Sequence, residues 1–128
     1  MGPDRSKSYQ EPGARTRVDL TRALRSSDPR EICAALVSAA FRGPDWRWVQ
    51  SECVRLAEAE DSEVRGVVAT CIGHLARIHG TVDLDVVEAV LSRLARDPDP
   101  VVASRVADAR EDIAMFAKTG GKKGRGAG

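Results

Sequence analysis

Cys71 and His74 are the first residues whose types and spacing suggest chemistry. They lie three positions apart, so on a helix their side chains are neighbours. A thiolate and an imidazole placed in this way can bind a metal ion or act as a nucleophile and its base. Zinc generally needs further ligands, however, and the sequence has no Cys-x-x-Cys pair or second histidine-rich segment to supply them. Cys71 also falls within an apolar stripe, where burial disfavours the thiolate. We therefore expect no catalytic residue, no metal site and no cofactor.

The cysteines as a group indicate a reducing compartment. There are three, Cys33, Cys53 and Cys71, all on helical faces predicted to point inward. An odd number of thiols without an apolar secretion signal is typical of reduced, buried cysteines. No apolar run approaches the roughly 18 residues of a membrane span. The sequence thus predicts a cytoplasmic protein that does not contact a membrane.

Charge is distributed unevenly along the chain of 128 residues, whose formal net charge is +1. Residues 1–30 carry +3 and residues 118–128 carry +4, whereas residues 31–117 carry −6. An acidic body repels phosphate groups, so we expect that the folded part does not bind nucleic acid. The segment 120–123 (Gly-Gly-Lys-Lys) lacks the following Ser or Thr and the preceding strand of a phosphate-binding loop.

Both ends of the chain are predicted to be disordered tails. Residues 1–17 are interrupted by Pro and Gly, and residues 120–128 form a basic, Gly-rich stretch of low complexity. The basic residues of the second tail either keep the protein soluble or contact an RNA or a membrane surface. A single domain is therefore expected over residues 18–119.

Between the tails, apolar residues recur with helical spacing. The clearest stripe predicts a helix from Asp61, as its N-cap, to Gly80, as a left-handed C-cap; its members are Val64, Val67, Val68, Cys71, Ile72, Leu75 and Ile78. Similar signals predict helices at 18–24, after Asp28-Pro29, from Trp46, after Thr81 or Asp83, and after Asp99-Pro100. Glu31 is placed to accept from the amide of Asp28. No segment alternates with the period of a strand, so the fold is predicted to be all-α.

The helices belong to an internal repeat. A shift of 38 residues superposes seven identical residues across a helix, a turn and a helix, among them Leu56 on Leu94 and Asp61 on Asp99. A looser shift of about 32 includes the first helices, for example Ile32 over Val64. The repeated unit is a helical hairpin, used three times.

The segment Asp61–Ala69 resembles the second helix of the HEAT repeat, a member of the armadillo-type helical repeats. Residues 99–107 give a second copy, in which Ala103 replaces Arg65. The resemblance implies a short right-handed α-solenoid of about three antiparallel helix pairs. The stretch from residues 46–50 to residues 69–80 is also similar to small bacterial HEAT-repeat proteins, some of which belong to toxin and immunity loci.

In such a solenoid the second helices of the three pairs line one surface. Eight polar residues fall on it, and their charge changes from basic to acidic along the stack: Ser38, Arg42, Thr70, His74, Arg77, Asp108, Glu111 and Asp112. We expect this surface to bind another protein, with the chain itself monomeric.

The sequence therefore favours a non-catalytic protein-binding module over an enzyme. The resemblance implies an immunity protein that occludes a cognate bacterial toxin, and a generic scaffold or regulatory adaptor is the alternative. A HEAT-like enzyme of the DNA-glycosylase or lyase type is less favoured, because an acidic body with few aromatic residues lacks a basic groove and a base pocket.

Two patterns have more than one interpretation. Gly66, Ala69, Gly73 and Ala76 form a strip of small residues that predicts a close approach by a neighbouring helix or by a partner. Trp46 and Trp48 cannot both face inward on one helix. Trp48 is expected either to pack against the first pair, on the helix between Asp28 and Phe41, or to be an exposed anchor.

Overall fold

The computed structural model describes residues 12–117, which form six helices and no strand. The helices are α2 (Pro12–Ser26), α3 (Pro29–Arg42), α4 (Trp46–Leu56), α5 (Ser62–His79), α6 (Leu84–Leu94) and α7 (Pro100–Phe116). The prediction of an all-α fold is thus confirmed for this part of the chain. The predicted tails fall largely on residues 1–11 and 118–128, which lie outside the described residues.

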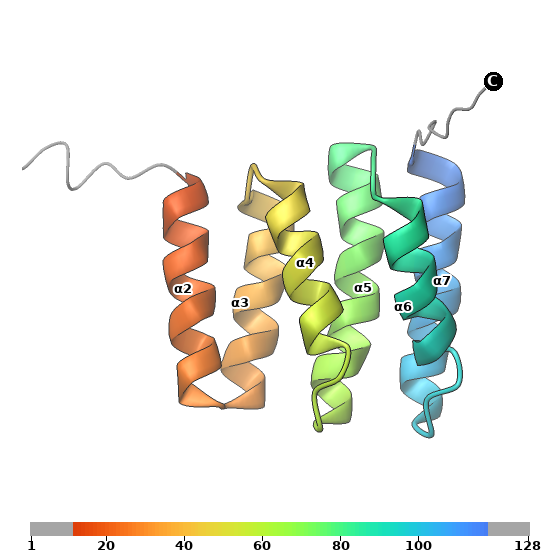
Figure 1. Cartoon of the computed structure of the whole chain (residues 1–128), viewed down its shortest axis with the longest axis horizontal. Coiled ribbons are helices and arrows are strands. Elements are labelled where there is room, and N and C mark those ends of the chain that lie inside the picture. The colour runs from red at the N-terminus through yellow and green to blue at the C-terminus, as the bar shows by residue number, and fades with distance from the viewer. Residues whose placement is uncertain (1–11, 118–128) are drawn as a thin grey trace, which may run out of the picture.

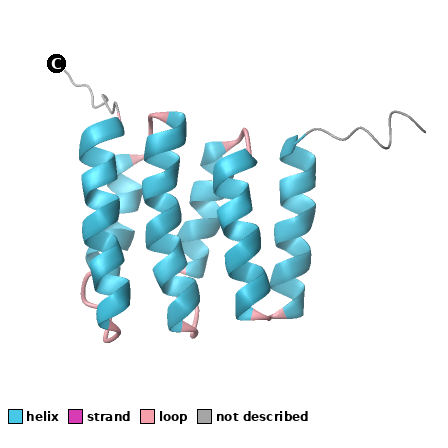
Figure 2. Ribbon diagram, turned by 180° about the vertical axis from the view of Figure 1, so that it is seen from behind, coloured by secondary structure: helices cyan, strands magenta, loops and turns pink. Residues whose placement is uncertain are grey.

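Three helices form one layer of the molecule. α3, α5 and α7 lie side by side and run in the same direction, as both views show (Figures 1 and 2). α4 and α6 run in the opposite direction and cover one side of this layer, while α2 lies beside α3. The most extensive helix contact joins α5 to α7. We call the end at which α3, α5 and α7 terminate the upper end, as in Figure 1.

Aspartates begin the helices at the predicted positions. The carboxylates of Asp28, Asp45, Asp61 and Asp99 each accept a hydrogen bond from a backbone amide in the first turn. Asp83 makes no such bond; instead its own amide donates to Gln50 Oε1 at 2.8 Å. These caps satisfy amides that have no partner within the helix.

Other boundary predictions were confirmed or corrected. Gly80 ends α5 with φ +72°, the predicted left-handed conformation. The amide of Asp28 donates to Ser26 Oγ at 3.2 Å, so this hydroxyl takes the place expected for Glu31. α2 begins at Pro12 rather than at residue 18, because Pro is tolerated in a first helical turn. Thr16 and Leu20 of this longer helix are buried.

The core consists of aliphatic side chains and Cys. In α5 the predicted stripe is buried at Val64, Val68, Cys71, Ile72 and Leu75. Val67 is only partly buried. Ile78, which was expected in the same stripe, is 40% exposed because it lies in the last turn of α5, where the layer ends. The stripe therefore predicts the core except at this end.

The small-residue strip of α5 faces α7. A Cβ added to Gly73 would lie 3.2 Å from the Cα of Ala109 and 2.8 Å from Asp112 Oδ2. A Cβ at Gly66 would meet only Val102 Cγ2, at 3.8 Å. A neighbouring helix thus explains the strip, and only Gly73 is placed where the two backbones approach closely.

Trp46 and Trp48 lie in the first turn of α4. Both side chains are partly buried against the core. The guanidinium of Arg17, from α2, lies over the ring of Trp48 at 4.8 Å and pairs with Asp45 at 2.7 Å. Trp48 is therefore partly buried and contacts the first helix pair through Arg17 of α2, rather than through the helix between Asp28 and Phe41 that the prediction named.

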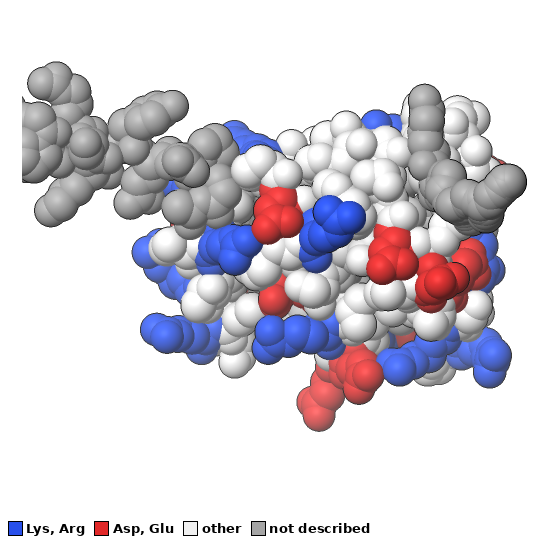
Figure 3. Space-filling view, turned by 45° about the horizontal axis from the view of Figure 1, so that its top comes forward, with Lys and Arg blue, Asp and Glu red and all other residues white. Residues whose placement is uncertain are grey.

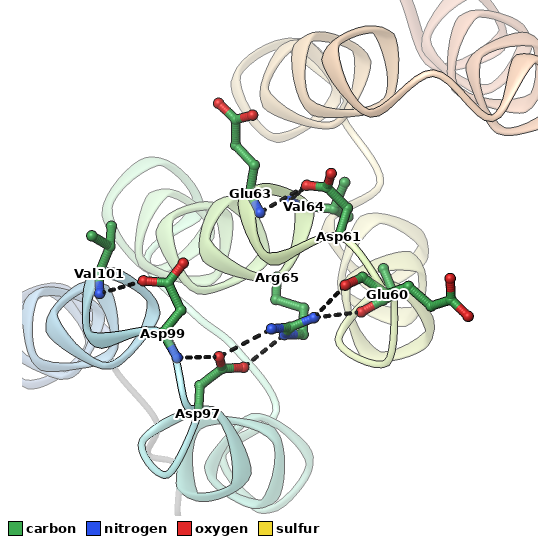
Figure 4. A network of polar contacts seen from close by, with 9 residues as sticks. Glu60, Asp61, Glu63, Val64, Arg65, Asp97, Asp99 and Val101 are labelled. Atoms are coloured by element: carbon green, nitrogen blue, oxygen red, sulfur yellow. Dashed lines mark hydrogen bonds and ion pairs between the residues drawn. The ribbon is translucent and has the colours of Figure 1, made fainter.

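Arg65 joins three segments of the chain (Figure 4). Its Nε and Nη2 donate to the two carboxylate oxygens of Asp97 at 2.6 and 3.1 Å, and its Nη1 donates to the carbonyls of Ala59 and Glu60 at 2.9 and 2.8 Å. Asp97 also accepts from the amide of Asp99, which caps α7. The hydrogen bond from Arg65 lowers the pKa of Asp97. One guanidinium thus fixes the turns that precede α5 and α7.

Replacing Arg65 should strongly destabilise the fold. Arg65→Ala removes two of the three donors to the carboxylate of Asp97, whose side chain is only 6% exposed, and leaves two carbonyls without this donor. We expect a loss of about 2–3 kcal/mol in the free energy of unfolding, measured by urea denaturation. Arg93→Ala is the matched control, because the Arg93–Glu58 pair is exposed; it should cost about 0.5 kcal/mol or less. Equal losses of stability in the two variants would show that the hydrogen bonds of Arg65 do not hold the turns before α5 and α7 together.

The two helical glycines should respond in opposite ways to larger side chains. Gly66→Ala places its methyl group in ordinary contact and removes the cost of a helical glycine, so it should stabilise the protein by about 0.5–1 kcal/mol. Gly73→Leu must push α7 away and should lower the free energy of unfolding of the protein by about 1–3 kcal/mol. Thermal or urea unfolding of both variants would measure the difference. A neutral Gly73→Leu variant would contradict the close approach.

Candidate protein-interaction surface

The eight polar residues predicted to bind a partner lie on α3, α5 and α7 and all reach solvent. Arg42, Arg77, Asp108 and Glu111 are exposed, and Ser38, Thr70, His74 and Asp112 are partly buried. We call these eight residues the ridge surface. Their side chains come from three parallel helices of one layer, so residues far apart in the sequence are brought near one another (Figure 2).

His74 connects α3 and α5 at the centre of this surface. Its ring lies 4.6 Å from the ring of Phe41, centroid to centroid, and its Nδ1 is 3.0 Å from Nη2 of Arg77. Burial and the adjacent Arg77 lower the pKa of His74, although Asp112 opposes this effect. The neutral imidazole can therefore accept a hydrogen bond from Arg77 at Nδ1. Phe41 was not among the predicted site residues.

α7 contributes both signs of charge. Asp112 lies against α5 because Gly73 has no side chain at this point. Arg105, which was not among the predicted site residues, donates from Nη1 to Thr70 Oγ1 at 3.2 Å. The predicted change from basic to acidic along the stack must therefore be corrected, since α7 places one cation beside the acidic residues Asp108 and Glu111.

A shallow apolar hollow lies along α3 next to the contact between Phe41 and His74. Its lining residues are Cys33, Ala34, Val37, Ser38, Phe41 and Arg42. Cys33 is only partly buried, so the prediction that it points inward holds in part. The spacing of Cys33, Val37 and Phe41, four residues each, marks a second apolar stripe beside the core stripe of Ile32 and Leu36. That spacing was the available signal for this hollow.

The thiols are poorly suited to nucleophilic chemistry. Cys53 and Cys71 are buried, and all three cysteines are free. Burial raises the pKa of Cys71 to about 12 and that of Cys53 well above its usual value. Within residues 12–117, no group of three or more His, Cys, Asp or Glu side chains could hold a metal ion. Cys71 and His74 are thus not joined by a third such ligand in the part of the chain that the structure describes.

His79 lies in the last turn of α5, as expected, and its Nε2 has no hydrogen-bond partner among the described residues.

None of the described helices combines the length and apolar character that crossing a bilayer requires.

Comparisons with known proteins give no relative. No family model, no curated protein and no solved structure matches the chain.

Proposed function

We propose that the protein is a non-catalytic, protein-binding module of the HEAT-like type that binds its partner on the ridge surface. The pairs α2–α3, α4–α5 and α6–α7 would form the three units of a short right-handed solenoid. The observation that carries the proposal is the apolar hollow of α3, which is lined by Phe41 and Arg42 and lies next to the ring contact between Phe41 and His74. Apolar contact area beside ordered polar groups is typical of protein interfaces.

The hollow supplies contact area, and the charges supply orientation. Val37 and Phe41 offer apolar surface that a partner could cover, and Phe41 is 50% exposed. Arg42 and Arg77 lie in the last turns of α3 and α5, whereas Asp108 and Glu111 lie on α7. A partner with the opposite arrangement of charges would be steered into one orientation, which affects the association rate more than the affinity.

The resemblance to small bacterial HEAT-repeat proteins makes the proposal more specific. In that form the protein is a cytoplasmic, monomeric immunity protein that covers the active region of a cognate toxin. A scaffold or regulatory adaptor would use the same surface, and the identity of the captured partner distinguishes the two functions.

A charged substitution in the hollow should abolish binding of the partner protein. Val37→Arg places a charge among apolar lining residues. A protein that the wild type captures from an extract of the producing cells should therefore be absent from the proteins that this variant captures. Val86→Arg is the matched control, since Val86 is 36% exposed and lies on α6, in the other layer. Mass spectrometry of the captured proteins reads the result. Recovery of the same partner by both variants would exclude the hollow as the binding site.

The acidic part of the ridge surface should act mainly on association. Asp108→Asn combined with Asp112→Asn should slow binding of a basic partner several-fold at low salt, and the difference should fade at about 0.5 M salt as charges are screened. Glu60→Gln with Asp85→Asn removes the same charge away from the ridge surface and is the control. Surface plasmon resonance with the captured partner measures the rates. An unchanged rate at low salt would assign Asp108 and Asp112 to solubility alone.

A further inference from the structure

The two outermost helices, α2 and α7, each have one side without a neighbouring helix in the part of the chain that the structure describes. α2 lies at one end of the molecule and packs mainly against α3, whereas α7 lies at the other end and packs against α5 and α6 (Figures 1 and 2). In stacked helical hairpins such a side is normally covered by the next unit. The free sides of α2 and α7 are therefore surfaces against which a further helix can pack.

The free side of α2 is basic. Thr16, Leu20 and Ala23 are buried, and the opposite side of the helix carries one residue per turn. These residues, which we call the α2 row, are Arg15, Val18, Arg22 and Arg25. All four are exposed, and Val18 is 49% exposed. Asp19, the one acidic residue of α2, lies about 100° around the helix from Val18. Figure 3 shows basic side chains along this edge of the molecule, at the left.

The free side of α7 combines acidic residues with an apolar one. Val102, Val106, Ala109 and Ile113 are buried. The opposite side carries Ser104, Asp108, Glu111 and Met115, which we call the α7 row. All four are exposed, and Met115 is 74% exposed. The two arginines of α7 are directed to other helices, since Arg105 donates to Thr70 of α5 and Arg110 pairs with Glu88 of α6.

The two ends of the molecule carry opposite net charge. Residues 12–42, which include α2 and α3, contain six arginines and three acidic residues, a net charge of +3. Residues 84–116, which include α6 and α7, contain four arginines and seven acidic residues, a net charge of −3. The charged residues of both rows form no ion pair with any described residue. Opposite charge at the two ends favours contact of one end with the other.

The two rows also match in direction and spacing. α2 runs away from the upper end and α7 runs towards it, so two copies placed side by side in the same orientation bring α2 and α7 together antiparallel (Figure 1). Intervals of four and then three residues occur in both rows when they are followed away from the upper end. One register therefore places three pairs opposite one another: Val18 with Met115, Arg22 with Glu111, and Arg25 with Asp108.

Charge distinguishes the possible occupants of the α2 row. Residues 1–11 carry two cations and two anions, so they have no net charge to attract the arginines. Residues 118–128 carry four cations and would be repelled. The α7 row of a second copy offers both a large apolar side chain and two carboxylates at the required spacing.

We propose that copies of this protein associate end to end, with the α2 row of one chain packed antiparallel on the α7 row of the next. This contact joins two different surfaces, so each pair keeps one free row at either end and further copies can add. Rows of four residues form a small contact, so the chain is monomeric when dilute and associates at high concentration. The inference does not depend on the proposed binding of a partner protein, because the hollow of α3 takes no part in it.

Sedimentation equilibrium of the full chain tests the proposal. At about 0.5 mM protein and about 0.05 M salt, the weight-average mass of the wild type should exceed that of one chain about 1.5-fold or more. It should rise with concentration without levelling off at two chains, because the contact does not close. At about 0.5 M salt the mass should return to that of one chain, since the ion pairs are screened.

Charge reversal tests which surfaces meet. Arg22→Glu with Arg25→Glu gives an α2 variant, and Asp108→Arg with Glu111→Arg gives an α7 variant. Each variant alone should remain at the mass of one chain, because like charges then face each other. An equimolar mixture of the two should associate again, because the unchanged α7 row of the first variant meets the unchanged α2 row of the second.

The matched control reverses the same amount of charge away from both rows. Arg30→Glu with Arg47→Glu changes two exposed arginines in the first turns of α3 and α4 and should associate like the wild type. All variants should keep the circular dichroism and thermal midpoint of the wild type, since the replaced side chains are exposed or partly so. A wild type that stays monomeric at about 0.5 mM, or a mixture of the two variants that does, would overturn the proposal. Loss of association in the α7 variant but not in the α2 variant would also overturn it, because residues 118–128 of a neighbouring chain would then occupy the α7 row.

Discussion

Helices as short as these are at best marginally stable in water alone, so neighbouring helices must cover one another's apolar faces. This constraint explains the central position of α5. One side of it packs with Val64, Val68 and Leu75 in the core, and another packs with Gly66 and Gly73 against α7. The absence of a side chain at Gly73 allows the backbone of α7 to approach, and this approach also sets where Asp112 lies.

Arg65 makes the packing of these helices specific at their starts. Apolar contacts alone allow helices to slide or rotate, since the hydrophobic effect has no direction. A planar guanidinium that meets both oxygens of Asp97 and two carbonyls accepts only one geometry. Because Asp97 also accepts from the amide of Asp99, the same contact fixes the N-cap of α7. The start of α7 is thus held in place by hydrogen bonds.

The parallel layer of α3, α5 and α7 gives the molecule two distinct surfaces. Along the helices, the hollow of α3 combines apolar area with the cation Arg42 and lies beside the contact of Phe41 with His74. At the helix ends, Phe41, Ile78 and Met115 reach the same level because the helices share a direction. Phe41 belongs to both surfaces, because it lines the hollow and lies in the last turn of α3.

Features that depend on local spacing could be predicted from the amino-acid sequence. The helices, their aspartate caps, the left-handed Gly80 and most of the buried stripe of α5 follow from residues within a few positions of one another, where helical geometry is fixed. Which polar side chains meet depends on the tertiary packing. Arg65 and Asp97 are 32 positions apart, and Arg105 and Thr70 are 35 apart, so no helical period relates them. The early start of α2, the exposure of Ile78 and the place of Phe41 beside His74 likewise depend on where neighbouring helices begin and end. These are long-range packing relations, and local propensity does not encode them.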